Sequence, residues 1–224
     1  MELGTFTTVL DDGAEVLASL TGLIPVAERV GIRPILAGHR RPTGDLLARD
    51  ALLLVPVRLV ETPTSRVTIS PGLNVPIGSI GAGTRFTPLS SGSVDPWLSV
   101  DAIAGGSWLG SASLAVRTPL YAGVDGVTQG AFVRGSVRGA RRIGTGGAAW
   151  VGVSPVVGLA DTAGRGGFAE VAATAGGTIP LSTTWALTPR LRVPMWQVTS
   201  DYTVSLGLAL SAVLGGGSVE ETAD

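Results

Sequence analysis

The sequence predicts an all-β protein, an antiparallel up-and-down transmembrane β-barrel of about 12 strands. The first observation behind this prediction is composition: of 224 residues, 45% are hydrophobic and 15% charged, while 33 are Gly and 14 are Pro. Gly and Pro disfavour helix interiors, and an ordinary soluble domain carries about 25% charged residues. The mean hydropathy of +0.41 excludes a disordered chain. No segment reaches the roughly 18 consecutive apolar residues of a membrane helix.

The second observation is a hydrophobic period of two, which is typical of strands with two different faces. It is clearest near the end of the chain, where Val204, Leu206, Leu208, Leu210, Ala212 and Leu214 alternate with Thr203, Ser205, Gly207, Ala209 and Ser211. Residues 66–77, 111–117 and 131–138 alternate in the same way, with Leu114 and Val133 on the apolar face. The alternating segments are longer than the usual 5 or 6 residues of soluble strands and suit the roughly 9–11 of a transmembrane strand.

The third observation is the position of the aromatic residues. They flank the expected strands, where rings suit the two membrane–water interfaces of a barrel. A soluble core with tryptophans at its edges is the alternative explanation. The aromatic residues that flank the expected strands are Trp97, Trp108, Tyr121, Trp150, Trp185, Trp196 and Tyr202.

Turn residues divide the alternating pattern into eleven strands, and short and long connections follow each other for most of the chain. The tight Asp11–Asp12–Gly13 turn is expected on the periplasmic side. Bacterial barrels have even strand numbers, so we expect a twelfth strand upstream of Met1; a strand within 27–45 is the less favoured alternative. Residues 1–214 are expected to form one barrel domain and 215–224 a flexible tail. The strands are expected at 3–10, 14–26, 46–60, 66–77, 95–105, 109–119, 130–141, 148–159, 168–179, 185–195 and 202–214.

Several segments resemble a known family. The segment Ser70–Ser79 (SPGLNVPIGS) resembles the "PGLxLPxGS" strand of the outer-membrane transporter-like β-barrels grouped with the phenol-degradation MetA-type proteins. Thr43–Asp45, Ser91–Pro96 and Asp201–Leu208 are similar to three further elements of that family. The resemblance implies a barrel of about 10–12 strands that passes or binds small, often apolar, compounds. The chain departs from the family in its Gly215–Asp224 tail, which lacks a terminal aromatic residue.

Features that would indicate an enzyme are scarce, and we expect no enzymatic activity, cofactor or metal. The chain has no Cys, and its one histidine, His39, lies in an expected loop without a nearby Ser. A phosphate loop follows a strand and opens a helix. Neither Gly144–Gly147 nor Gly81–Gly83 has this context, and both are interpreted as hairpin turns. The basic pairs Arg40–Arg41 and Arg141–Arg142 are either solvated strand ends or contacts to lipopolysaccharide phosphates. The acidic pairs Asp11–Asp12 and Glu220–Glu221 are interpreted as solvated.

Alternation also predicts which charged side chains face the lumen. Arginines exceed acids among them, so an open lumen would have a positive wall, whereas interlocking salt bridges would fill a lumen of this size. The predicted lumen-facing residues are Arg58, Arg66, Asp101, Arg117, Arg134, Arg138, Glu170, Arg190 and Arg192, with Glu15 and Asp50.

These observations predict an outer-membrane barrel of the Gram-negative envelope that acts as a narrow pore or transporter for a small solute. The alternatives are a plugged barrel serving as a structural or anchoring subunit, and a soluble all-β binding module. The expected partners are outer-membrane lipids and a small solute; the net charge of −1 gives no footprint for nucleic acid. The sequence starts without a signal peptide, so we expect that one has been removed or truncated.

Overall fold

The computed structural model describes residues 2–10, 13–40, 46–77, 94–119, 131–159, 167–198 and 202–212, and every regular element within them is a β-strand. No helix in this part of the chain is long and apolar enough to span a membrane. The fifteen strand segments form a single sheet. They are β1 (Glu2–Leu10), β2 (Gly13–Thr21), β3 (Ile24–Ala27), β4 (Val30–Arg40), β5 (Leu46–Ala48), β6 (Ala51–Leu54), β7 (Val57–Thr62), β8 (Ser65–Val75), β9 (Asp95–Gly105), β10 (Trp108–Arg117), β11 (Phe132–Ile143), β12 (Gly147–Gly158), β13 (Phe168–Pro180), β14 (Trp185–Val198) and β15 (Tyr202–Ala212).

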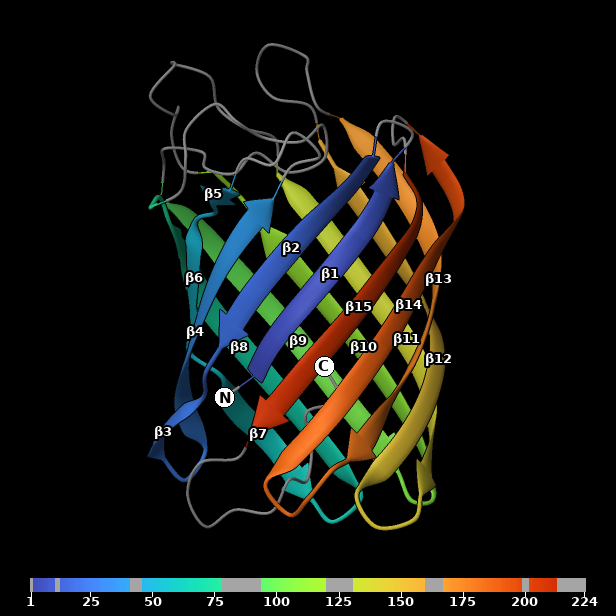
Figure 1. Ribbon diagram of the computed structural model, residues 1–224. Helices are drawn as coiled ribbons and strands as arrows, with labels where there is room; N and C mark the ends of the chain where they lie inside the picture. Colours follow the sequence, from blue (N-terminus) through green and yellow to red (C-terminus); the bar gives the residue numbers. More distant parts are fainter. Residues whose placement is uncertain are drawn as a thin grey trace.

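The sheet closes on itself into a barrel of tilted antiparallel strands (Figure 1). Strand β1 pairs with β2 along one edge and with β15 along the other, and β2 continues to β4. Because β2 and β3 follow one another along one course of the barrel, and β5, β6 and β7 along another, the fifteen described segments make twelve courses. Closure gives the long strands of the barrel a neighbour on both sides, while the short segments β3 and β5 pair with β4 alone. A closed sheet lowers the risk that an unpaired edge strand recruits another chain.

The twelfth strand lies within 27–45, and the prediction of a strand upstream of Met1 to complete the barrel is wrong. Strand β4 fills this place, and both edges of β1 are already paired. The sequence did not predict β4 because this strand contains proline and glycine. Pro34 cannot donate a ladder hydrogen bond, and a proline usually argues against a central strand. Pro34 is tolerated because the neighbouring course is interrupted at Gly22 and Leu23, and the Pro34 carbonyl still accepts a hydrogen bond from the Gly22 amide at 3.2 Å.

The two ends of the barrel differ in their connections. One end carries short connections at 28–29, 63–64, 106–107, 144–146 and 181–184; we call it the short-turn end. Glu2 lies opposite both Thr21 and Ser211, so the first and last strands also begin and end there. The opposite, loop end carries the connections at 76–94, 118–131 and 159–167. The β1–β2 connection is at the loop end, so the expectation that Asp11–Asp12 shares a side with the short turns is wrong.

The two faces of the wall have opposite chemistry. Along the outer face, large apolar side chains are exposed, such as Val151 at 66% and Leu114 at 52%. Along the inner face, small and polar side chains are buried, such as Ala172 and Asp95, both at 0%. A monomer in water rarely exposes a contiguous apolar surface larger than a few hundred Å². The outer face is therefore built for contact with lipid.

The tryptophans divide between the two faces. Trp108 and Trp185 begin strands at the short-turn end, Trp196 lies near the loop end, and all three are exposed. They agree with the predicted interfacial rings. Trp97 and Trp150 do not, because they share the inner face with Ser99 and Ser154, and Trp150 is only 7% exposed. Tyr121 lies outside the described residues, as does the side chain of Tyr202.

Candidate functional site

The inner face of the barrel gathers the charged side chains of the strands. The register places there the residues expected in the lumen, namely Asp50, Arg58, Arg66, Asp101, Arg117, Arg134, Arg138, Glu170, Arg190 and Arg192. The side chain of Glu15 lies outside the described ones. The register adds two residues of each sign, Arg33, Glu61, Asp95 and Arg142, so the predicted excess of positive charge is unchanged.

A stack of cations and rings lines the inner face near the loop end. The Arg117 guanidinium lies 5.4 Å from the centroid of the Phe132 ring, and Phe132 meets Trp97 edge to face at 5.4 Å. The Arg134 guanidinium lies 5.6 Å from the centroid of the Trp97 ring on the same stack. Each ring face attracts a cation through its quadrupole. The result is a pair of rings with a cation at each end, Arg117–Phe132–Trp97–Arg134, along the wall.

Acids bind this loop-end stack to the wall. The Arg117 Nε lies 3.8 Å from the Asp95 Oδ2, and the Asp95 side chain is completely buried. One strand further on, Asn74 lies opposite Asp95 and donates a hydrogen bond from its Nδ2 to the Asp50 Oδ2 at 2.9 Å. Burying a carboxylate is costly unless it is paired. The acids therefore fix Arg117 and Asn74 in place.

A second buried acid lies on β13. Glu170 is 5% exposed, and its Oε1 accepts hydrogen bonds from the Arg192 Nε at 2.9 Å and from the Arg192 Nη2. The two residues are 22 positions apart in the chain and lie on neighbouring strands. By contrast, the Arg58–Glu61 pair near the short-turn end is exposed, with side chains 38% and 42% accessible. The first pair is therefore part of the barrel interior and the second is solvated.

Two glycines on the inner face make room for a third arrangement. The Arg138 guanidinium lies 4.8 Å from the centroid of the Trp150 ring. A Cβ added at Gly152 would come within 2.7 Å of the Arg138 Cγ, and one added at Gly176 would overlap the Trp150 ring. Gly176 lies opposite Arg190 on β14. Gly152 and Gly176 thus allow Arg138 and Trp150 to lie flat against the wall beside Arg190.

Replacing Gly176 tests this arrangement. We expect Gly176→Ala to lower the free energy of unfolding by about 1–3 kcal/mol, because the methyl group overpacks the Trp150 ring. Gly139→Ala is the matched control, since nothing lies within 4 Å of a Cβ there. In a Gly176→Ala/Trp150→Ala double variant the ring that the methyl group would contact is absent. Its loss of unfolding free energy, measured by denaturant titration, should therefore be smaller than the sum of the two single losses. Additive losses would contradict the contact.

The structure locates some of the other residues that were singled out in the sequence. His39 lies in β4 and not in a loop, opposite Leu17 and Leu47. Residues 144–146 form the β11–β12 hairpin turn, with positive φ at Gly144 and Gly146. Within the described ranges, no three His, Cys, Asp or Glu side chains cluster in a way that could hold a metal. Gly81–Gly83, Thr43–Asp45, Arg41 and Glu220–Glu221 lie outside the described residues.

Asp95, Trp97 and Arg33 were missed as inner-face residues. Trp97 and Asp95 are two and four residues before Ser99, and the period of two therefore places all three on one face. The position of Trp97 near a strand end led instead to the prediction of an interfacial ring. Arg33 was missed together with β4 itself.

A closed up-and-down antiparallel sheet, apolar outside and charged inside, defines the fold class of the outer-membrane β-barrels. No protein-family model matches the chain, and no curated protein matches it. The chain is similar in structure to the COG4313 outer membrane channel from Pseudomonas putida F1, with a TM-score of 0.70, 12% identity and coverage of 95% of both chains. It is also similar to the NanC porin, with a TM-score of 0.62, 8% identity and coverage of 95% of this chain and 99% of that one.

The KdgM porin in complex with disordered oligogalacturonate is a third similar structure, with a TM-score of 0.55 and 7% identity over 96% of this chain and 100% of that one. At these identities the likeness concerns the fold. All three proteins are named as channels or porins, so the chain has an outer-membrane channel fold.

Proposed function

We propose that the chain forms a narrow outer-membrane channel that passes small solutes and prefers anions. The observation that carries the proposal is the excess of arginines over acids on the inner face of a closed barrel whose outer face suits lipid. Charged side chains lining a pore set its selectivity, and Arg favours anions. The proposed activity is passage of a solute and not catalysis. The kinship with MetA-type proteins, suggested by Ser70–Ser79, is part of this proposal.

The proposed orientation follows from the two ends of the barrel. Outer-membrane barrels have short periplasmic turns and longer outer loops. The short-turn end, where β1 begins and β15 ends, is therefore placed in the periplasm, and the connections at 76–94 and 118–131 outside. The stack of Arg117, Phe132, Trp97 and Arg134 then lies toward the outer mouth, where an incoming anion first meets the wall.

The test is ion preference in a planar bilayer under a KCl gradient. Two unit charges ~8 Å apart in water interact by about 0.5 kcal/mol, and screening at about 0.1 M salt roughly halves this energy. Each arginine attracts chloride and repels potassium, so Arg134→Ser/Arg138→Ser should change the balance by about 1 kcal/mol and lower the chloride-over-potassium permeability ratio about fivefold. The anion preference of the unchanged protein should weaken at high salt, because the Debye screening length shortens. Arg141→Gln is the control: Arg141 stacks on the exposed Trp108 outside the barrel, so its loss should leave the ratio unchanged.

A cation preference in the unchanged protein would contradict the proposed charge of the pore. A protein that inserts and conducts nothing would favour a second candidate, a plugged barrel acting as a structural or anchoring subunit. One observation supports that candidate: the inner face of β14 and β15 is closely packed near the short-turn end, where Ala186, Thr188, Ala209 and Ser211 are at most 3% exposed. The exposed apolar outer face argues against the third alternative, a soluble binding module.

A further inference from the structure

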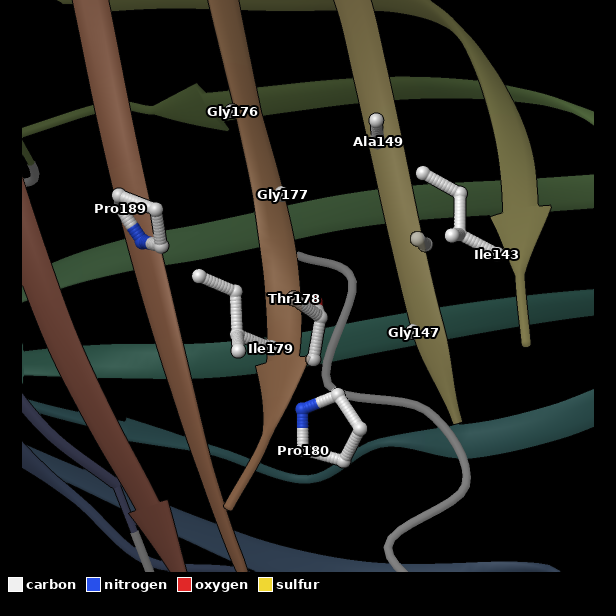
Figure 2. A pocket seen from close by; sticks show the side chains of 10 residues that line it. Ile143, Gly147, Ala149, Gly176, Gly177, Thr178, Ile179, Pro180 and Pro189 are labelled. Atoms are coloured by element: carbon white, nitrogen blue, oxygen red, sulfur yellow. The ribbon is translucent and has the colours of Figure 1, made fainter. Parts of the chain in front are cut away.

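The outer face of the barrel contains a groove near the short-turn end. It has a volume of about 400 Å³ and crosses β12, β13 and β14, bounded by Ile143 and Ile179 and by the rings of Pro180 and Pro189. Figure 2 shows these side chains around Ala149 and Gly177, which form its floor. Ile143 and Ile179 are 58% and 50% exposed, so the groove opens on the lipid side of the wall.

The groove exists because two small residues meet in the wall. Ala149 lies opposite Gly177, whereas other outward positions of the same strands carry Val151, Val153 and Ile179. Apolar side chains gain no hydrophobic energy against lipid, so contact there depends on van der Waals packing, which small residues improve by close approach. A space left empty would forfeit those contacts. A flexible hydrocarbon chain fits such a shallow apolar channel.

A cation, Arg141, lies next to the groove on the outer face, on the neighbouring strand β11. Arg141 lies opposite Ala149 on one side and Trp108 on the other, and its guanidinium is 5.5 Å from the centroid of the Trp108 ring. Arg141 and Trp108 are both exposed on the outer face. In the described part of the chain, no carboxylate forms an ion pair with Arg141. The ring holds the guanidinium in place through its quadrupole and leaves its donors for an anion.

The strand positions show that this row rises from the short-turn end into the wall. Trp108 is the first residue of β10, and Arg141 is two residues from the end of β11. Ala149 is two residues into β12, Gly177 is three from the end of β13, and Pro189 is four into β14. The cation therefore lies nearest the membrane–water interface, and the apolar floor leads from it toward the membrane interior, as the tilt of the strands in Figure 1 requires.

We propose that this surface is a binding site for one phospholipid of the periplasmic leaflet, with its phosphate on Arg141 and an acyl chain in the groove. A guanidinium binds phosphate oxygens through paired N–H donors, and the rigid proline walls hold the groove ready for the chain. Arg141 lies at the end away from the loops, so a lipopolysaccharide contact is not the role assigned to it. The inference rests on the proposed membrane placement and orientation, but not on conduction.

The experiment is native mass spectrometry of the full chain, purified in detergent, stripped of lipid and mixed with palmitoyl-oleoyl phosphatidylglycerol. The unchanged protein should retain one lipid. Arg141→Gln should lower the bound fraction about tenfold, the effect of losing a charge-assisted hydrogen bond, and Ala149→Leu should lower it by filling the groove. The matched controls are Arg142→Gln, which is one residue along and faces inward, and Val151→Leu, which is exposed outside the groove; both should bind as the unchanged protein does.

Two further lipids separate the sources of binding. Palmitoyl-oleoyl glycerol lacks the phosphate, and its equal retention would overturn the role of Arg141. Retention of lipid A in preference to the phospholipid would overturn the assigned leaflet. The heat-dependent gel shift of each variant reports whether the barrel has folded. Arg141→Gln should conduct like the unchanged protein. An unchanged protein that conducts but retains no lipid would contradict only this site, and one that retains the lipid but does not conduct would contradict only the channel.

Discussion

Arg192→Gln is expected to lower the free energy of unfolding by roughly 3 kcal/mol, because it removes the charged partner of a buried carboxylate. The Glu170 side chain is 5% exposed and accepts hydrogen bonds from two nitrogens of Arg192. Urea titration of the protein in lipid vesicles, followed by tryptophan fluorescence, measures the loss. The double variant Glu170→Gln/Arg192→Gln should recover most of it, since replacing both partners is far cheaper than leaving one charge behind.

Arg58→Gln is the matched control for this prediction. Arg58 also pairs with a glutamate, Glu61, at 2.9 Å, but both side chains are more than a third exposed. Exposed pairs contribute about 0–1 kcal/mol, so this variant should unfold almost like the unchanged protein. Equal losses for Arg58→Gln and Arg192→Gln would show that burial of Glu170 does not decide the energy of its pair.

Leu208→Arg is expected to cost about 2–4 kcal/mol, because Leu208 faces the lipid at the middle of β15, where a charge finds no solvent. Leu208 is 48% exposed on the outer face and lies opposite Pro189 of β14. The same urea titration measures the change. Leu208→Met keeps the volume and the apolar character, so it should cost less than about 1.5 kcal/mol.

An Arg at the neighbouring position, Ala209→Arg, would cost less stability than Leu208→Arg if it pointed into an open lumen, but the structure leaves no such room. Ala209 is 1% exposed on the inner face, so an Arg there would overpack the wall. The sharper contrast is between Leu208→Arg and Leu208→Met, which differ in charge. If the two variants unfold alike, Leu208 does not face hydrocarbon, and the membrane placement of β15 is wrong.

The two faces of the wall could be predicted from the sequence because alternation is local. Successive side chains of any strand point to opposite faces, so the alternation of Leu206 and Leu208 with Gly207 and Ala209 shows the two faces without knowledge of a neighbour. The same rule places Arg134 and Arg138 together on the inner face. The all-β class and most strand positions followed from this pattern and from the turn residues between the strands.

The rule failed where composition hid it. Strand β4 contains Pro34 and two glycines, Gly31 and Gly38, which are typical of loops. Pro34 is acceptable in β4 because the adjacent course is interrupted at Gly22, and that interruption is a property of the neighbouring strand. The strand count, the side on which Asp11–Asp12 lies and the completion of the barrel all followed from this one misread segment.

By itself, the sequence determined the β-class, the apolar and charged faces, and the excess of arginine inside. Only the tertiary structure decided which residues meet. The Glu170–Arg192 pair, the stack of Trp97 on Phe132, and the groove between Ala149 and Gly177 all join different strands. The physical reason is that the direction of a side chain depends on its own strand alone, whereas its contacts depend on the register with the next strand. Register is set by turns, bulges and closure of the whole sheet.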